Sequence, residues 1–143
     1  MYTGEYNHTV DSKGRLILPS KLREALGEEF VVTKGVDGCL FVYDKTEWSH
    51  FEEKLNTLSI TNRESRKALR FFLSGAASVE VDKQGRILIP ASLKEHAALE
   101  KDVVLIGVGS RMEIWSKERW EGTVTYQDME DISRHMIELG IGI

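Results

Sequence analysis

The sequence predicts a mostly β fold of the α+β class: a pseudo-twofold β-barrel made of two interlocked tandem repeats, with short helices at its periphery. Three observations lead to this prediction. A motif occurs twice, the apolar residues around both copies form short strand-like runs, and each repeat of about 45 residues is too small to bury an adequate core alone. Two such units can share a core by wrapping around each other, each hairpin completing the other's sheet.

The repeated motif is the feature around which the chain is organised. It reads VDSKGRLILP at residues 10–19 and VDKQGRILIP at residues 81–90. Asp, Gly, Arg and Pro recur in register, with an apolar triplet between Arg and Pro. The chain has only two prolines, and both stand at this equivalent position. The motif is therefore one supersecondary unit that is used twice.

The motif and the residues before it predict a strand, a turn and a return strand. In the first repeat these are expected at residues 5–10, 11–14 and 15–18. Asp11 can hydrogen-bond the backbone ahead of it, and Gly14 can adopt a positive φ without steric cost, so both residues shape the turn. The return strand is apolar on both faces beyond its arginine, which predicts that it is covered on both sides.

A short helix and a second pair of strands complete the first repeat. Pro19 is expected to start a helix over residues 21–26, and Gly27 is expected to end it. Strands should follow at residues 30–33 and 39–43, joined by a glycine-containing turn.

The second repeat follows the same order. The offset between equivalent positions is constant through the short helix and is expected to grow by one beyond it, where Val103 matches Val31 and Gly107 matches Gly35. A single inserted residue is therefore expected near the end of the helix. The same alignment makes the glycine-rich residues 107–110 a hairpin turn and not a phosphate-binding loop.

Helices are also predicted between the two repeats and after them. Asp44-x-x-Glu47 and Thr61-x-x-Glu64 resemble capping boxes and predict two helices, the second reaching about Leu73. The chain is therefore expected to divide into four parts. The first repeat spans residues 4–48, the linking helices 49–74, the second repeat 75–120, and the C-terminal helix and tail 121–143.

The C-terminal part can form an acidic amphipathic helix over residues 128–139. Its apolar stripe would consist of Met129, Ile132, Met136 and Leu139.

The composition limits the classes of function. Hydrophobic residues make up 41% and charged residues 29% of the 143 residues, and no apolar run is long enough for a membrane span. The first five residues lack the basic and apolar regions of a secretory signal. Cys39 is the single cysteine, so no intrachain disulfide is expected, which fits a reducing cytoplasm.

Charge and histidine placement argue against an enzyme and leave room for a nucleic-acid protein. The net charge of −4 excludes a uniformly basic surface but not a local basic patch, and residues 12–23 contain four basic residues and no acidic one. The four histidines share no ligand spacing with one another or with Cys39, so neither a metal site nor a cofactor is expected. Cys39 itself is expected to be a buried structural thiol.

The repeated D-x-x-G-R, apolar triplet and Pro resemble the motif of the AbrB class of swapped-hairpin transcription factors, which includes the MazE antitoxins. Two such units in one chain are similar to the MraZ family, as are the stretch RFFLSGA at residues 70–76 and the opening Gly4-Glu5-Tyr6-x-His8. The resemblance covers essentially the full chain, and it implies a swapped-hairpin β-barrel.

The resemblance also implies a function, that of a bacterial sequence-specific DNA-binding transcriptional regulator in the cytoplasm, associated with the nucleoid. The implied partners are double-stranded DNA, at direct repeats in the promoter of its own division and cell-wall gene cluster, and further copies of the chain in a ring-shaped homo-oligomer. No membrane, small-molecule substrate or cofactor is implied. The alternative is an antitoxin-like or scaffolding protein whose acidic C-terminal segment occupies a partner.

Two compatible roles are open for Arg15 and its equivalent Arg86. Each could pair with the aspartate of its own turn, Asp11 or Asp82, or point outward to phosphate or guanine, whose acceptors match its planar fork. The resemblance favours DNA and nominates six contact residues: Lys13, Gly14, Arg15, Lys83, Gly85 and Arg86. Because Lys13 aligns with Gln84, the copies are not equivalent, and the first is favoured.

Other basic residues could extend this surface. Lys21, Arg23 and Lys34 could bind phosphate, but an ordinary solvated face is favoured for them. A second set forms a stripe on the predicted linking helix, where solvent or intersubunit salt bridges are favoured over DNA; it consists of Arg63, Arg66 and Arg70.

Overall fold

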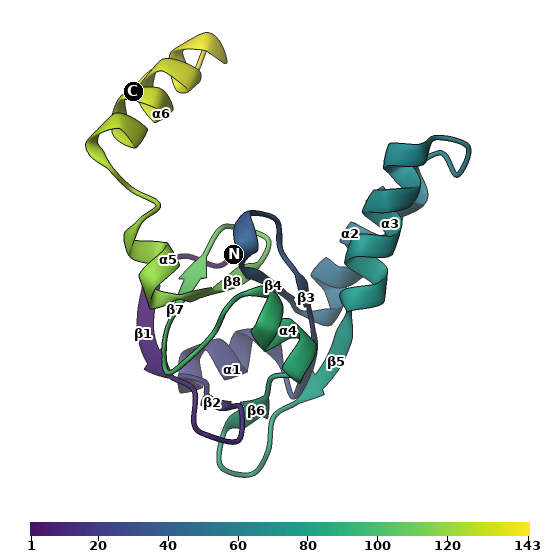
Figure 1. Ribbon diagram of the computed structural model, residues 1–143, viewed down its shortest axis with the longest axis vertical. Helices are drawn as coiled ribbons and strands as arrows, with labels where there is room; N and C mark the ends of the chain where they lie inside the picture. Colours follow the sequence, from purple (N-terminus) through teal and green to yellow (C-terminus); the bar gives the residue numbers. More distant parts are fainter.

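Strands of both repeats are combined in one six-stranded antiparallel sheet. Its strands are β1 (Glu5–Thr9), β3 (Glu29–Lys34), β4 (Leu40–Tyr43), β5 (Ala77–Glu80), β7 (Asp102–Gly107) and β8 (Met112–Ser116). In the computed structural model, which describes residues 1–143, their order is β1-β7-β8-β4-β3-β5 (Figure 1). Each strand has its equivalent at the mirrored place in this order: β1 and β5 are the two edges, β7 and β3 come next, and β8 and β4 are at the centre. The predicted pseudo-twofold arrangement is therefore confirmed.

The repeats interlock through their strand pairing. β1 pairs with β7, β5 with β3, and β4 with β8, and each of these pairs joins one repeat to the other. Only the hairpins β3–β4 and β7–β8 lie within a single repeat. Each repeat therefore completes the sheet of the other, as expected for units that are too small to bury a core alone.

The return strands of the motif form a separate two-stranded ribbon. β2 (Arg15–Ile17) pairs antiparallel with β6 (Arg86–Leu88), and Leu16 stands opposite Ile87 at its centre. Within its own repeat β2 keeps only an isolated bridge, between Val10 and Leu16. The motif is thus a hairpin whose second strand pairs with the equivalent strand of the other repeat.

The ribbon is covered on one face only, so the prediction that the return strand is covered on both sides is wrong. Leu16 and Ile87 point into the core and are 0% and 1% exposed, whereas their neighbours Ile17 and Leu88 are 56% and 59% exposed. Successive side chains of a strand point to opposite faces, and the six-stranded sheet packs against the inner face alone. The apolar outer face remains in contact with solvent.

Short helices follow both copies of the motif. They are α1 (Ser20–Leu26) and α4 (Ala91–His96), and each begins directly after the proline of its motif. Gly27 ends α1 with a φ of 85°, as the sequence predicts. The predicted turn between β3 and β4 contains the 3-10 helix η1 (Val36–Gly38).

In β7 the offset between equivalent residues of the two repeats is one position larger than the sequence alignment predicts. His8 stands opposite Val103, and its equivalent Val79 stands opposite Phe30, so Val103 corresponds to Phe30 and not to Val31. Phe30 and Val103 both lie in the core, whereas Val31 lies on the other face of its strand. The predicted match of Val31 with Val103 is wrong because a shift by a single position moves a strand residue to the opposite face.

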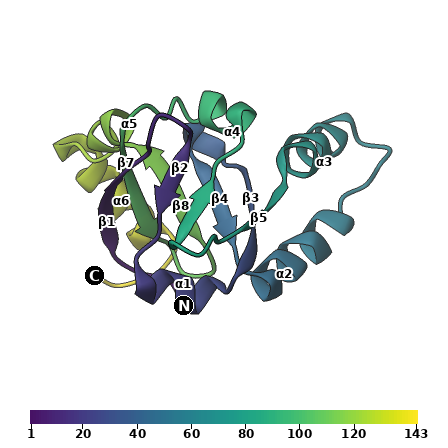
Figure 2. The same cartoon turned by 90° about the horizontal axis from the view of Figure 1, so that it is seen from below.

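Two linking helices cover the outer face of the sheet beside β3 and β4. They are α2 (Lys45–Asn56) and α3 (Arg63–Gly75), and together they form an arm that projects from the barrel (Figures 1 and 2). Aromatic rings hold the base of this arm: Phe51 stacks on Tyr43 at 5.0 Å, and Phe72 stacks on Phe41 at 6.2 Å between centroids.

The start of α2 agrees with the sequence prediction and the start of α3 differs. Asp44 caps α2, since its carboxylate accepts a hydrogen bond from the Glu47 amide at 2.8 Å. Asn62 caps α3 by accepting from the Ser65 amide at 3.0 Å, so the predicted cap at Thr61 is wrong by one position. The Thr61 hydroxyl is instead paired with Ser59.

The C-terminal helices leave the barrel at the opposite edge. α5 (Lys117–Glu121) packs on the sheet, and α6 (Tyr126–Glu138) projects away from the barrel beyond a short connection (Figure 1). Thr125 and Asp128 form a capping box at its start. The expected amphipathic helix is confirmed, and much of its apolar stripe is exposed, including Met129, Ile132 and Leu139. No helix has the length and apolar character that a membrane span requires.

Candidate nucleic-acid interface

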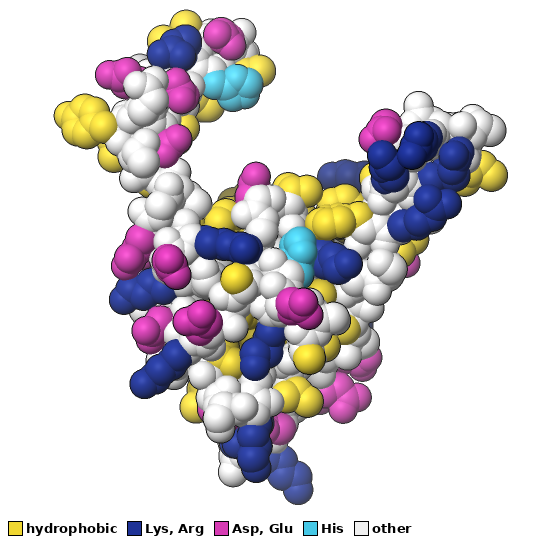
Figure 3. Space-filling model, in the orientation of Figure 1, with side chains coloured by type: hydrophobic (Ala, Val, Ile, Leu, Met, Phe, Trp, Pro, Cys, Tyr) yellow, Lys and Arg dark blue, Asp and Glu magenta, His cyan; other side chains and the backbone are white.

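The two motif turns lie side by side at one end of the barrel. In Figure 1 they project at the bottom, and the arm of α2 and α3 and the helix α6 extend from the other end. Figure 2, seen from below, shows β2 and β6 next to each other at this end. Lysine and arginine side chains gather around the turns in the space-filling view (Figure 3). The repeat therefore brings two distant parts of the sequence to one surface.

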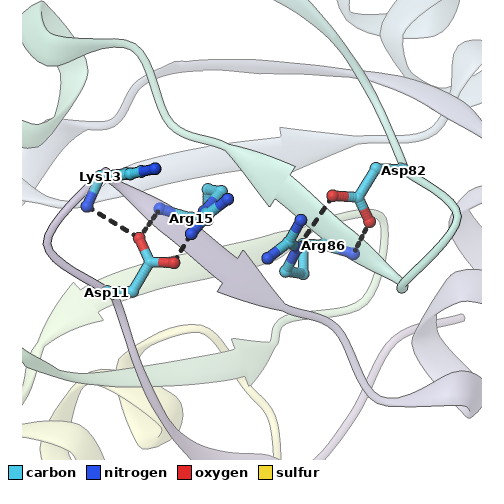
Figure 4. Close-up of polar contacts among 5 residues, drawn as sticks. All are labelled: Asp11, Lys13, Arg15, Asp82 and Arg86. Carbon is cyan, nitrogen blue, oxygen red and sulfur yellow. Dashed lines mark hydrogen bonds and ion pairs between the residues drawn. The ribbon is translucent and has the colours of Figure 1, made fainter.

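The first turn is built around the carboxylate of Asp11. Its Oδ1 accepts hydrogen bonds from the backbone amides of Lys13 and Arg15, both at 2.9 Å, and its Oδ2 accepts from Arg15 Nε at 2.7 Å (Figure 4). Gly14 has a φ of 82° and donates its amide to the Asp11 carbonyl at 3.0 Å. One short carboxylate thus shapes the turn and orients the arginine, so the pairing considered for Arg15 is present.

The second turn repeats this geometry. Asp82 Oδ1 accepts from the amides of Gln84 and Arg86 at 2.9 Å. Its Oδ2 accepts from Arg86 Nε at 2.9 Å, and Figure 4 shows both contacts with Arg86. In both turns the backbone hydrogen bond from the arginine is the first cause that lowers the pKa of the aspartate, and the side-chain hydrogen bond and charge of the arginine add to it. Both aspartates are therefore held ionised and paired.

The pairing with aspartate uses only part of each guanidinium group. Arg15 and Arg86 donate from Nε, and their Nη1 and Nη2 atoms make no hydrogen bond within the chain. Their side chains are 32% and 25% exposed. Each arginine is thus held at its base while the planar end of its fork can bind two further acceptors, as phosphate and guanine provide.

Each turn is also covered by a cation from the helix of the other repeat. The Cζ of Arg23, on α1, lies 2.9 Å from the position that a Cβ on Gly85 would occupy, and Arg23 Nε donates to the Leu18 carbonyl at 3.2 Å. Lys94, on α4, lies over Gly14 in the same way, with its Cδ 3.4 Å from the corresponding position. The positive φ of both residues, 82° and 77°, explains why both turns use glycine.

These two cations show what sequence reasoning missed. The sequence favours an ordinary solvated face for Arg23, which lies instead against the second turn. The sequence pattern assigns no role to Lys94, although the repeat makes it the equivalent of Arg23 and could have identified it. Each helix lies against the turn of the other repeat because the two repeats interlock, and the sequence of a single repeat does not show this contact.

The outer face of the ribbon joins the two turns. Arg15 stands opposite Leu88, and Ile17 stands opposite Arg86, so two cationic and two apolar side chains alternate on one exposed face. We refer to these four residues as the ribbon face. Together with the turns it carries six basic residues and two aspartates, the basic residues being Lys13, Arg15, Arg23, Lys83, Arg86 and Lys94.

The two turns differ in their surroundings. A cleft beside the second turn is lined by Lys83 and Asp82, and also by the carboxylates of Glu24 and Glu28 from the end of α1. The carbonyl of Glu28 accepts from Val81, and the carbonyl of Lys101 accepts from the equivalent Val10, so Lys101 takes the place of Glu28 in the second repeat and one of these carboxylates has no counterpart. An anion approaching the second turn meets more negative charge than one approaching the first.

Other candidates from the sequence lie elsewhere. Lys34 packs over the ring of Phe71 at 5.8 Å, and the stripe of Arg63, Arg66 and Arg70 is on the projecting arm, so neither joins the ribbon face. Cys39 is buried, which raises the pKa of its thiol to about 12 and makes it a poor nucleophile. No group of three or more His, Cys, Asp or Glu side chains comes together in a metal-binding arrangement.

Comparisons with known proteins give one consistent result. A family model described as "MraZ protein, putative antitoxin-like" matches the chain twice, over residues 1–71 and 72–138. A protein named "Transcriptional regulator MraZ" from Lachnoclostridium phytofermentans is 58% identical over 141 residues, which cover 99% of each chain. Proteins of the same name are 56% identical in Thermoanaerobacter sp. strain X514, covering 99% of this chain and all of that one, and 65% identical in Heliobacterium modesticaldum, covering 84% of each.

Proposed function

This chain belongs to the MraZ family, and from that membership we propose that it is a DNA-binding transcriptional regulator, not an enzyme, and that the ribbon face and its two turns make the DNA contacts. The observation that carries the proposal is the pair of arginines on one exposed ribbon, each oriented by an aspartate and each with its outer nitrogens unpaired. The contact residues are Lys13, Gly14, Arg15, Lys83, Gly85 and Arg86, and Arg23 and Lys94 extend the surface.

A two-stranded ribbon is an element that can enter DNA. The major groove of B-DNA admits a two-stranded β-ribbon, and an arginine fork can bind guanine O6 and N7 or a phosphate. Glycine at positions 14 and 85 lets the backbone approach closely, and the adjoining lysines supply phosphate contacts. The first turn makes the stronger contact because Lys13 has no basic counterpart at Gln84, and because Glu28 borders only the second turn.

Several protomers are needed for tight binding. Six or fewer phosphate contacts from a chain of net charge −4 give a modest electrostatic contribution, which scales with the phosphates neutralised. Direct repeats about 10 bp apart present successive sites on one side of the duplex. A ring of protomers that engages several repeats gains about 10²–10⁴ in apparent affinity without new contacts. The proposed target is the promoter of the chain's own division and cell-wall gene cluster, at the nucleoid in the cytoplasm.

The two projecting elements supply the contacts between protomers. α6 carries four acidic residues and one arginine, and α3 carries four basic residues and one glutamate, so the helices have opposite net charge. α6 also exposes apolar side chains that nothing in its own chain covers. Docking of α6 on α3 of the next copy is a heterologous contact, and such contacts form a ring when the rotation between successive copies closes. Residues 4–48 and 75–120 thus bind DNA, and residues 49–74 and 121–143 serve assembly.

Binding and protection experiments test this function. The DNA upstream of the gene is titrated with the wild-type protein, a shuffled duplex of the same composition serves as control, and protected positions are mapped by footprinting. We expect preference for the upstream DNA and protected sites repeated about once per helical turn. Equal affinity for the shuffled duplex would refute sequence-specific regulation.

An antitoxin-like or scaffolding role is the second candidate. The exposed stripe of α6 favours it, because a partner protein could cover the same side chains. Truncation after Gly122 distinguishes the two functions when self-association and partner capture are both measured. Loss of a heterologous partner with unchanged self-association would support the second function.

A further inference from the structure

The ribbon face contains two apolar side chains that the fold does not explain. Ile17 and Leu88 are 56% and 59% exposed, although the ribbon has buried neighbours of the same kind at Leu16 and Ile87. They occupy equivalent positions of the motif, so the exposed apolar residue recurs in both repeats. Strand pairing and core packing do not require apolar residues at these outward positions, because the side chains there point away from the core.

Each apolar residue stands directly opposite an arginine. Ile17 faces Arg86 and Leu88 faces Arg15 across the ribbon, at the separation of about 5 Å that opposed side chains have in antiparallel strands. Base pairs are stacked about 3.4 Å apart along the duplex. A ribbon lying in the groove therefore presents an apolar group within one or two base-pair steps of each arginine fork.

We propose that Ile17 and Leu88 contact the C5-methyl groups of thymines in the major groove and so contribute to sequence selection; this inference rests on the proposed DNA-binding function. The thymine methyl is the apolar feature of that groove, and apolar side chains recognise it there. The arginines bind acceptors at guanine or phosphate, and the apolar pair selects the neighbouring bases. Isoleucine and leucine differ in shape, so the two halves of the ribbon contact their thymines differently.

Self-association through the ribbon is the competing explanation of the exposed pair, and charge disfavours it. Six basic residues surround or belong to this surface, against two aspartates that are already paired and two glutamates, Glu24 and Glu28, at the edge of the second turn. A second copy docking the same surface would bring like charges together, whereas DNA brings phosphates. The patch thus fits a polyanion with apolar groups in its groove.

Replacing thymine by uracil tests the proposal without altering the protein, because uracil lacks only the methyl group. Wild-type affinity is measured for the protected upstream duplex with thymine and with uracil at every thymine position. We expect a loss of about fourfold for each methyl contacted. The double variant Ile17→Ser with Leu88→Ser should show that loss on thymine DNA and no further loss on uracil DNA. The control Val36→Ser, which changes a side chain that is 51% exposed on the η1 turn, should keep the full sensitivity to uracil.

Three results would overturn the proposal. The first is equal wild-type affinity for thymine and uracil duplexes; if the upstream DNA is still preferred over a shuffled duplex, this inference fails alone and the regulator function stands. The second is undiminished sensitivity to uracil in the double variant. The third is a lower oligomeric state of the double variant without DNA, which would assign the pair to self-association. Absence of any preference for upstream DNA would refute both proposals.

Discussion

Arg23 of the first repeat lies over Gly85 of the second, with its guanidinium carbon 2.9 Å from where a glycine-to-alanine change would place a methyl group. Lys94 covers Gly14 in the equivalent way. The two repeats therefore share more than a sheet: each supplies a cation to the turn of the other. Under the proposed function, both halves of the sequence contact an anion at either turn, which links DNA binding to the interlocked fold.

Both turn glycines are expected to be needed for stability. They have φ values of 82° and 77°, and alanine in this region costs about 1–2 kcal/mol. Gly14→Ala and Gly85→Ala should each lower the free energy of unfolding by about that amount, measured by urea denaturation. Gly142→Ala is the control, since a methyl group there meets nothing within 4 Å. Unchanged unfolding midpoints in both turn variants would show that the turns relax without strain.

Arg15→Ala is expected to remove most DNA binding and to leave the fold intact. The Nη atoms of Arg15 make no hydrogen bond within the chain, so the fold loses only the exposed pair with Asp11, whereas each bidentate contact to DNA is worth about 1–3 kcal/mol. A loss of tenfold or more is expected for one protomer, and several protomers multiply it. Fluorescence anisotropy at fixed salt measures affinity, and circular dichroism monitors the fold.

Arg86→Ala should have a smaller effect than Arg15→Ala. The second turn lacks a basic residue at Gln84 and is bordered by Glu28, which has no acidic counterpart at the first turn, so its arginine contributes less to binding an anion. Lys54→Ala on the arm removes the same charge far from the ribbon and should leave affinity unchanged. Equal losses for the two arginine variants would show that the copies are equivalent.

The sequence predicts the two turns and their aspartate–arginine pairs well and the surface around them less well, and the reason is physical. Aspartate, glycine and arginine act through contacts between near neighbours in the chain, so the turn can be recognised from its own sequence. The face to which Ile17 points depends on the pairing of β2 with β6, a strand of the other repeat. The further shift of register in β7 likewise emerges only when His8 and Val79 are compared through their partner strands.

Stability should fall in acid through the two turn aspartates. The hydrogen bonds from the arginine backbone and side chain lower the pKa of Asp11 and Asp82 below the ordinary value of 3.8. Because the folded-state pKa is the lower one, the stabilisation is fully present above the ordinary value and is lost as the pH falls through the folded-state pKa. Thermal melts between about pH 2 and pH 6 should therefore show less acid sensitivity in an Asp11→Asn, Asp82→Asn variant than in the wild type. Identical pH profiles would mean that the turn pairs contribute nothing to this dependence.

A charge exchange between α3 and α6 tests the proposed assembly. Arg63 and Arg70 lie about two helical turns apart on α3, and Glu130 and Glu138 have similar spacing on α6. The two arginines and Glu130 make no side-chain hydrogen bond or ion pair within the chain. Reversing either pair alone should prevent docking by like-charge repulsion, lower the mass seen by sedimentation, and reduce apparent affinity for repeat-containing DNA by about 10²-fold or more.

Reversing both pairs together should restore assembly and DNA binding, because the charges are again complementary. Lys54→Glu, also on the arm, controls for the change in net charge. Because the charge changes of the combined variant cancel, a general effect of net charge also predicts restoration. Restoration together with unchanged assembly of Lys54→Glu therefore supports direct pairing of α3 with α6. If the single reversals leave the mass unchanged, the copies associate through another surface. If they lower the mass while tight DNA binding persists, the proposed assembly is not required for DNA recognition.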